Sequence, residues 1–391
     1  MNPLESKIKE LAKLYFDDIV EIRRHLHKHP ELSFEEFNTS SFIQEKLNEY
    51  GISFTAGIVK TGIVALIEGK NPKSKCIALR ADIDALPIEE LNTHSFVSKH
   101  KGVMHACGHD VHTASLIGVA RILNELKHSW EGCVKLIFQP GEEKLPGGAS
   151  LMINEGVLNN PTVDKIIGQH VSPELECGTL GIRAGKFMAS TDEIYIDVIG
   201  KGGHAALPEG NINPIVIASN LISNLYERFS QYRDKPSVFS IGVIEGGTAG
   251  NIIPDSVSLQ GTFRAMNEEF RKEAHKIIGE ICDTVTQQFG GSFSLEIKKG
   301  YPFLSNDKEL TQLCFDTAAE FMGKQNVIEI PKRMTAEDFA YYSHHVPACF
   351  YRIGVGSRGE DRRYLHNAKF DVNENALIHS MGVMSWLAIN C

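Results

Sequence analysis

The stretch CIALRADI (76–83) decides the fold class, because most of its side chains are apolar on both faces of an extended chain. Three further stretches repeat this pattern: GIVALIEG (62–69), CVKLIFQP (133–140) and KIIGQHV (165–171). Helical periodicity lies between them, as in Thr113–Leu126. Strands without a polar face belong to a buried sheet that helices cover. The sequence therefore predicts a layered α/β fold.

A different pattern fills the middle of the chain. DEIYIDVIG (192–200) and SVSLQGTFR (256–264) alternate apolar and polar residues, which predicts strands with one buried face. The elements follow the order βαββαβ: strand 192–200, a helix capped by Asn213 with Pro214 at its first position, strands 238–246 and 256–264, a helix from Asn267, and strand 292–298. This order predicts a ferredoxin-like α+β unit with two helices on one sheet face. The other face and one edge stay free, which favours pairing with a second copy.

The α/β pattern resumes after about residue 300, with a strand at 346–354 and a closing helix at 376–388. We therefore expect one discontinuous α/β domain, made of residues 1–186 and 300–391. An inserted α+β domain of residues 187–299 interrupts it.

Composition narrows the possible classes of protein. The 391 residues are 42% hydrophobic and 23% charged, which is typical of a globular chain rather than a disordered one. The net charge is −9, whereas a nucleic-acid-binding protein needs a basic face. No apolar run approaches the ~18 residues of a membrane-spanning helix. We therefore expect neither a nucleic-acid partner nor a membrane partner.

The N-terminal residues and the cysteines bear on the compartment. MNPLESKIKELAKLYFDDIV (1–20) carries mixed charges and lacks the apolar core of a secretory signal. The eight cysteines are scattered along the chain, as expected of reduced thiols. Both observations favour a cytoplasmic protein.

Potential metal ligands are densest in MHACGHDVH (104–112). Cys107 and His109 lie two residues apart on a loop, so both side chains can reach one metal ion. The alternative is a polar turn in which Asp110 caps the following helix. In FQPGEEKLPGGA (138–149), two adjacent carboxylates follow a strand, and the alternative there is a solvated glutamate pair.

Three weaker signals join these two. His170 closes an apolar run, His366 lies in a C-terminal loop, and Asp82 and Asp84 follow a buried strand. Each has a structural alternative, such as a core histidine or a capping aspartate. Four of the five features lie at strand ends of one α/β domain, where ligand sites gather. Cysteine, histidine and glutamate together suit two divalent ions bridged by one soft or anionic group.

At these residues the chain resembles the dinuclear-metal family of aminoacylases and carboxypeptidases. It is most similar to the amidohydrolase branch of hippurate hydrolases, N-acetyl-diaminopimelate deacetylases and plant indole-acetyl–amino acid hydrolases. The matching segments span the chain in the family's order: RRHLHKHPELSFEE (23–36), LRADIDALPI (79–88), MHACGHDVHTASLIG (104–118), FQPGEEKLPGGA (138–149), GKGGHAALPEGNINPI (200–215), GTAGNIIPDSVSLQGTFR (247–264), TAEDFAYY (335–342) and LHNAKFDVNENAL (365–377). The resemblance implies a metal-bearing catalytic domain with an inserted lid domain that mediates homodimerisation.

The resemblance also implies a ligand for each metal ion. Cys107 would hold both ions as a thiolate, where many relatives have a bridging aspartate. His109 and His170 would complete one site, and Glu143 and His366 would complete the other. Zn²⁺ suits such ligands by softness, and Mn²⁺, Co²⁺ or Ni²⁺ are alternatives.

The same resemblance implies the catalytic roles. Glu142 would act as general base toward a metal-activated water, and would then return the proton to the leaving amine. Asp84 matches the acid that supports the metal centre, and Asp82 competes with it for that role.

Three residues of the inserted domain are implied in substrate handling. His204 would donate to the developing oxyanion, and its alternative is a turn histidine between small residues. Asn251 and Arg264 would bind the substrate carboxylate, since arginine grips a carboxylate with two parallel hydrogen bonds. Plain solvation is the alternative for Arg264.

The resulting prediction is a metal-dependent hydrolase of N-acyl amino acids, small molecules whose acyl group and amino acid stay open. One alternative is a metallo-exopeptidase or dipeptidase of the same family. Others are a non-catalytic metal-binding relative and a self-associating scaffold. Glu142 argues against the last two, because neither a structural metal site nor a scaffold needs a general base.

Overall fold

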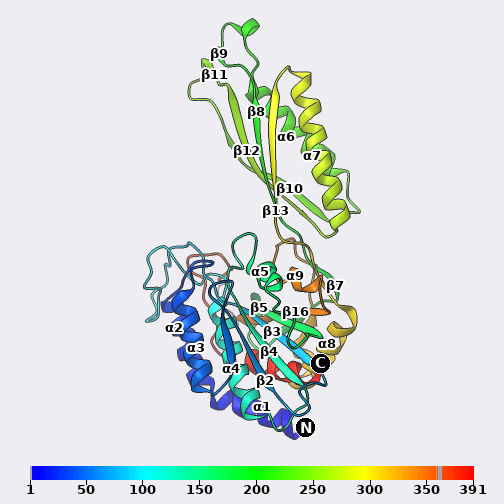
Figure 1. Ribbon diagram of the computed structural model, residues 1–391. Helices are drawn as coiled ribbons and strands as arrows, with labels where there is room; N and C mark the ends of the chain where they lie inside the picture. Colours follow the sequence, from blue (N-terminus) through cyan, green and yellow to red (C-terminus); the bar gives the residue numbers. More distant parts are fainter. Residues whose placement is uncertain (1, 358, 360–362) are drawn as a thin grey trace. The chain divides into compact units, whose positions relative to one another are not determined.

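The computed structural model describes residues 2–357, 359 and 363–391, and these divide into two compact units (Figure 1). The α/β unit comprises Met1–Gly185, Ser305–Pro331 and Tyr341–Cys391. The inserted unit comprises Lys186–Leu304 and Lys332–Ala340. Strands β7 (Gly185–Met188) and β14 (Leu304–Asn306) and helix α9 (Ala340–Ser343) lie where the chain passes between them.

An eight-stranded mixed sheet forms the centre of the α/β unit, in the order β1-β2-β4-β3-β5-β16-β6-β15. Its strands are β1 (Phe54–Ile58), β2 (Gly62–Glu68), β3 (Cys76–Asp82), β4 (Cys133–Gln139), β5 (Lys165–Glu176), β6 (Leu180–Ile182), β15 (Val327–Glu329) and β16 (Ala348–Gly356). The four central strands β4, β3, β5 and β16 run parallel. Every residue of β3 and β4 is buried, which confirms the predicted α/β class.

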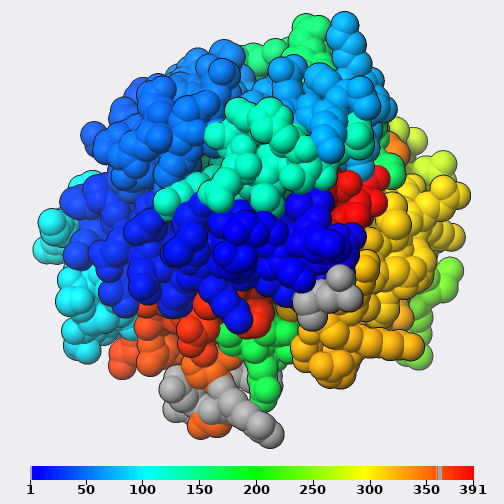
Figure 2. Space-filling model, turned by 90° about the horizontal axis from the view of Figure 1, so that it is seen from below, coloured from blue at the N-terminus to red at the C-terminus, as the bar shows by residue number. Residues whose placement is uncertain are grey.

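Helices cover this sheet: α1 (Pro3–Leu14), α2 (Phe16–Lys28), α3 (Phe37–Glu49), α4 (His109–Glu125), α5 (Gly148–Asn154), α8 (Lys308–Met322) and α10 (Ala376–Asn390), with a short 3₁₀ turn at Lys324–Asn326. Helix α4 packs between α2 and α10 and is buried along most of its length. Figure 2 shows the dark-blue N-terminal helices laid across one face of the unit, beside red residues near the C-terminus. Among the described residues, no helix combines the length and apolar character needed to cross a bilayer.

The inserted unit has the predicted order, β8 (Asp192–Ile199), α6 (Pro214–Ser230), β10 (Ser237–Glu245), β12 (Ser256–Ala265), α7 (Glu268–Gln288) and β13 (Ser292–Lys299). The four strands form an antiparallel sheet in the order β10-β12-β8-β13. A short pair, β9 (Gly203–His204) and β11 (Ile252–Ile253), and a 3₁₀ turn at Pro208–Gly210 complete the unit.

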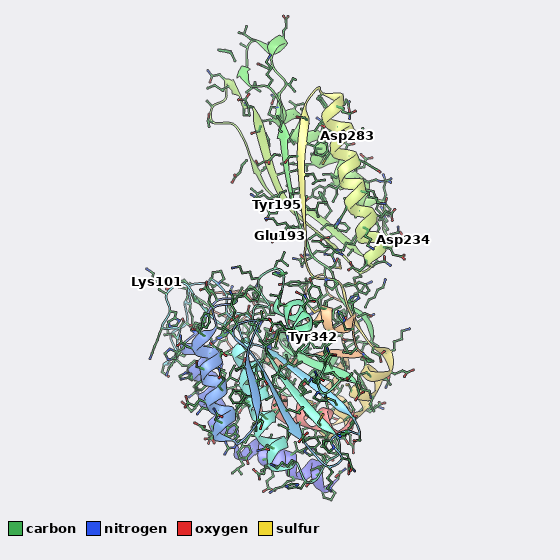
Figure 3. The ribbon with its side chains drawn as sticks, in the orientation of Figure 1. Lys101, Glu193, Tyr195, Asp234, Asp283 and Tyr342 are labelled. Carbon is green, nitrogen blue, oxygen red and sulfur yellow. The ribbon has the colours of Figure 1, made fainter. Side chains whose placement is uncertain are left out.

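Alternation along β8 explains why only one face of this sheet is packed. Ile194, Ile196 and Val198 are buried in the core that α6 and α7 share with the sheet. Glu193 and Tyr195 project from the opposite face (Figure 3), where the Tyr195 hydroxyl donates to Glu193 Oε2 at 2.9 Å. The sheet therefore has one apolar and one polar face, as the alternating sequence predicts.

Candidate metal centre

The loop before α4 brings two potential ligands together at a backbone position that requires glycine. Gly108 has a φ of 83° and serves as the N-cap of α4, without any side-chain cap. A Cβ at this position would lie 2.4 Å from Val171 Cγ2 on the neighbouring strand β5. The loop can therefore press against β5, with Cys107 and His109 on either side of the glycine.

Asp110 is not the cap of this helix, so the alternative interpretation of the motif as a capped polar turn is wrong. Its carboxylate is completely buried and accepts a hydrogen bond from Arg23 Nε at 2.7 Å. It also lies 2.8 Å from His27 Nδ1. Asp110 thus ties the start of α4 to helix α2.

Two groups of potential ligands share the Cys107 thiol. The first contains His109 and His170, and the second contains Glu143 and His366, with all ligand atoms of a group within 4.8 Å of one another. Cys107 Sγ lies 3.4 Å from His170 Nε2, and His366 Nε2 lies 3.3 Å from Glu143 Oε1. The structure therefore brings the five predicted ligands together, although they come from four separate segments of the chain.

Local contacts fix which atom each histidine presents. His109 Nδ1 lies 2.9 Å from the main-chain oxygen of Asp84 and 3.2 Å from its Oδ1. His170 Nδ1 lies 2.7 Å from the main-chain oxygen of Val171. Both rings therefore turn Nε2 toward the thiol.

The backbone of His366 joins the C-terminal loop to the loop before α4. It is left-handed, with φ 58°, and its N–H donates to Ala106 O at 2.8 Å.

Among the described residues, His109 Nε2 is buried without a hydrogen-bond partner, and the buried Glu143 Oε1 has its 3.3 Å ion-pair contact with His366 in place of a hydrogen bond. Burying polar atoms with so few partners is costly, so both atoms call for a ligand that satisfies them. A thiol, imidazole nitrogens and carboxylate oxygens are ligands that bind divalent transition ions. The residues present therefore fit two cations that share Cys107.

The pKa shifts of the cluster also indicate that it favours a bound cation. Burial raises the pKa of the Cys107 thiol, and the charge of Glu143 raises it further. Burial would lower the pKa of His109, but the charges of Asp82 and Cys107 outweigh it and raise that pKa. Contacts with Cys107 and Glu143 raise the pKa of His366 to about 10. The cluster thus concentrates negative charge and favours positive charge at its centre.

Asp84 contacts two of the candidate ligands. Its Oδ1 faces His109, and its Oδ2 accepts hydrogen bonds from the Ser33 hydroxyl at 2.6 Å and from Glu143 N at 3.0 Å. Burial opposes ionisation of Asp84, but the hydrogen bonds from His109 and Ser33 outweigh it and lower its pKa. Such contacts orient a ligand and raise its basicity.

Asp82 has a different environment. It lies 2.6 Å from His112 Nδ1 and 2.6 Å from Arg80 Nη1, and its Oδ2 is 3.6 Å from His109 Nε2. His112 Nε2 in turn accepts the N–H of Val171 at 2.9 Å. Both ring nitrogens of His112 are therefore occupied by protein groups, so it supports the site rather than acting as a free ligand.

Glu142 follows strand β4 in the turn Pro140–Gly141–Glu142, and only 7% of the residue is exposed. Its carboxylate lies with the His109 imidazole and the Glu143 carboxylate in a third group of potential ligands. The alternative of a solvated glutamate pair does not hold for Glu142, because this residue is buried within the group.

Sequence reasoning missed two residues that support the site. Ser33 donates to Asp84, and Glu36 accepts the main-chain N–H of Gly141 at 2.9 Å. Both lie in PELSFEE (30–36), which matched the family pattern but received no role. No sequence signal marked them, because their burial is seen only in the structure.

The residues predicted for substrate handling lie in the inserted unit. His204 is exposed on β9. Its neighbour Ala205 donates its N–H to Asn251 O at 3.0 Å, which places Asn251 near His204. The register pairs His204 with Ile252, the residue after Asn251. Arg264 lies on β12, and its Nη1 donates to Met334 O at 3.3 Å. Burial lowers the pKa of Arg264, and no carboxylate pairs with its guanidinium among the described residues.

Known proteins match this chain over most of its length. Residues 78–388 match the model of peptidase family M20/M25/M40. The N-acetyl-L-cysteine deacetylase of Bacillus subtilis is 40% identical over 362 residues, covering 92% of this chain and 85% of that protein. The N-acyl-L-amino acid amidohydrolase of Geobacillus stearothermophilus is 40% identical over 307 residues, covering 78% of this chain and 82% of that protein.

A solved structure is also similar. The Bacillus subtilis YXEP protein, described as a dinuclear metal binding peptidase from the M20 family, superposes with a TM-score of 0.81 and is 34% identical. The match covers 96% of this chain and 98% of that chain.

Proposed function

Since the chain belongs to peptidase family M20/M25/M40 and is a hydrolase of that family, we propose that it cleaves the amide bond of N-acyl amino acids. Two relatives that are each 40% identical bear names of this activity. The observation that carries the proposal is the Cys107 thiol shared by two groups of ligands, with Glu142 buried beside them.

Each residue then has a role in hydrolysis. Cys107 would hold both ions, with His109 and His170 as further ligands of one and Glu143 and His366 as further ligands of the other. When bound, such ions would supply the means to lower the pKa of a water molecule toward ~7 and to polarise the amide carbonyl. Zn²⁺ is our proposed native metal, with Mn²⁺, Co²⁺ and Ni²⁺ as alternatives.

Proton transfer is assigned to Glu142. As general base it takes a proton from the attacking water, and as general acid it returns the proton to the leaving amine nitrogen. Asp84 keeps His109 in the tautomer that presents Nε2, through the 3.2 Å contact with Nδ1.

The inserted unit supplies the remaining roles. We assign His204 as donor to the developing oxyanion, and Asn251 and Arg264 as ligands of the substrate carboxylate. The guanidinium of Arg264 supports this assignment, because it is partly desolvated and lacks a carboxylate partner among the described residues. We further propose that the inserted unit, residues 187–299 by our boundaries, acts as lid and homodimer interface, and that the protein works in the cytoplasm.

An amine-release assay tests the proposal directly. Metal-free protein, and protein loaded with Zn²⁺, Mn²⁺, Co²⁺ or Ni²⁺, is incubated with a panel of N-acyl amino acids and dipeptides. Metal-dependent release from N-acyl amino acids supports the proposal. Cleavage of dipeptides alone would replace it with an exopeptidase; the YXEP protein is described as a peptidase.

The general base has its own test. Glu142→Gln should retain both ions and lose ~10²–10⁴ in kcat, the usual contribution of a positioned acid–base group. The control Glu45→Gln alters an exposed carboxylate on α3 and should leave kcat unchanged. Activity of Glu142→Gln within threefold of the wild type would remove Glu142 from this role.

A further inference from the structure

The segment Ser33–Glu36 lies directly against the turn that carries Glu142. Glu36 is completely buried, and its Oε1 accepts the N–H of Gly141 at 2.9 Å and the N–H of Phe34 at 2.8 Å. Its Oε2 accepts the Thr61 hydroxyl at 2.7 Å. Both carboxylate oxygens are therefore used by three separate parts of the chain.

Packing reinforces these hydrogen bonds. Gly141 has a φ of 62°, and a Cβ there would lie 2.4 Å from two ring carbons of Phe34. Phe34 itself has a left-handed backbone, with φ 68°. Non-glycine residues rarely adopt such a conformation, and Glu36 holds it by accepting the N–H of Phe34. The ring of Phe34 thus fills the space beside the glycine.

The two amides that flank Glu142 are both anchored to buried carboxylates. Gly141 N donates to Glu36, and Glu143 N donates to Asp84 at 3.0 Å, where Ser33 holds the same Asp84 oxygen. The main chain of Glu142 is therefore held on both sides. The anchor on the Glu143 side also contacts a ligand of the metal centre, whereas Glu36 contacts none of the proposed metal ligands.

We propose that Glu36 is a positioning residue, which sets the placement of Glu142 by holding the Gly141 N–H. The inference rests on the proposed role of Glu142 as general base. A base must lie within hydrogen-bond reach of the proton it takes, and a displacement of ~1 Å can cost ~10²-fold in rate. Glu36 touches neither substrate nor metal ligands, so it acts through the turn alone.

The test compares Glu36→Ala with the matched control Glu35→Ala, which removes the same charge from the exposed neighbouring residue. Glu36→Ala should lower kcat ~10–100-fold, with KM within about twofold and both ions retained. Hydrogen exchange of peptides covering 139–149 should become faster in this variant. Glu35→Ala should match the wild type in every measurement.

The conservative variant Glu36→Gln separates shape from charge. Its amide oxygen can accept the same two N–H groups, and its NH₂ can donate to the Thr61 hydroxyl oxygen. We therefore expect kcat within about threefold of the wild type, which would rescue the loss seen in Glu36→Ala.

Two results would overturn the inference. One is a folded, metal-loaded Glu36→Ala with wild-type kcat and wild-type exchange. The other is a variant that loses its metal ions together with its activity, because Glu36 would then act on the metal centre instead. If Glu36→Ala does not fold, Thr61→Val carries the test, with a few-fold lower kcat expected and an unchanged kcat and exchange overturning the inference.

Failure of the proposed function is recognisable separately. A wild-type protein that releases no amine from N-acyl amino acids contradicts the function. The exchange rate of the 139–149 peptides still reports whether Glu36 holds the turn.

Discussion

Gly108→Ala should destabilise the α/β unit through two separate effects. The residue lies between two proposed metal ligands, with a φ of 83° that side chains rarely adopt. The added methyl group would also lie 2.4 Å from Val171 Cγ2, well inside van der Waals contact. Val171 is completely buried on β5, so it has little room to move away.

The expected magnitude follows from adding the two effects. A left-handed backbone costs a non-glycine residue ~1–2 kcal/mol. Overpacking a dense core costs a further ~1–3 kcal/mol. We therefore expect Gly108→Ala to lower the free energy of unfolding by ~2–5 kcal/mol.

A second glycine isolates the backbone effect. Gly57 has a φ of 86°, and a Cβ there would meet no atom within 4 Å. Gly57→Ala should therefore cost only the ~1–2 kcal/mol of the backbone conformation. The difference between the two alanine variants, measured by urea unfolding, gives the cost of the clash.

A double-mutant cycle completes the test. Val171→Ala removes the methyl groups that would collide with the new side chain, at a cost of ~2–3 kcal/mol on its own. In the double variant the two costs should fall short of their sum by ~1–3 kcal/mol, because the clash disappears. Additive costs, or equal stability of Gly108→Ala and Gly57→Ala, would refute the reasoning.

Three further predictions concern buried charges. Asp84→Asn should weaken metal binding ~10–100-fold, because an amide NH₂ facing His109 Nδ1 disfavours the tautomer that carries the proton there. Unchanged affinity in equilibrium dialysis would contradict this. Arg23→Met leaves the Asp110 carboxylate buried without the partner that donates to it at 2.7 Å, so it should lower the free energy of unfolding by ~3–5 kcal/mol. A loss below ~1 kcal/mol in urea unfolding would show that the pair is dispensable. Burial, helped by the charge of Asp84, raises the pKa of Glu36 from 4.5 to about 7, so the native state holds a proton that the unfolded state releases. Stability should therefore fall by ~3 kcal/mol as the pH rises through 4.5 to 7, and Glu36→Gln should lack this dependence in a pH series of unfolding curves.

Much of the fold was predictable from periodicity, because periodicity reports directly which side of an element is buried. Fully apolar strands such as CIALRADI indicated the covered sheet, and alternation in DEIYIDVIG indicated the half-exposed one. Helix α4 begins at His109, four residues before the predicted start at Thr113. The reason is that its first turn is stabilised by Gly108 and buried partners rather than by a capping side chain, so no sequence signal marks it.

The choice between Asp82 and Asp84 could not be made from their spacing. Two residues at i and i+2 share one side of an extended chain, which made them equivalent in the sequence. Strand β3 ends at Asp82, and the chain then departs from the strand. Asp84 consequently meets Ser33 and His109, while Asp82 binds Arg80 and His112.

The sequence by itself determined the α/β class, the inserted βαββαβ unit and a short set of candidate ligands, because these depend on local periodicity and on residue chemistry. Only the tertiary structure decided which distant residues meet. The contact between Glu36 and Gly141 joins residues 105 positions apart through a main-chain N–H, a group that every non-proline residue carries. Such a contact leaves no pattern in the sequence, since its geometry arises only when strand, loop and turn pack together.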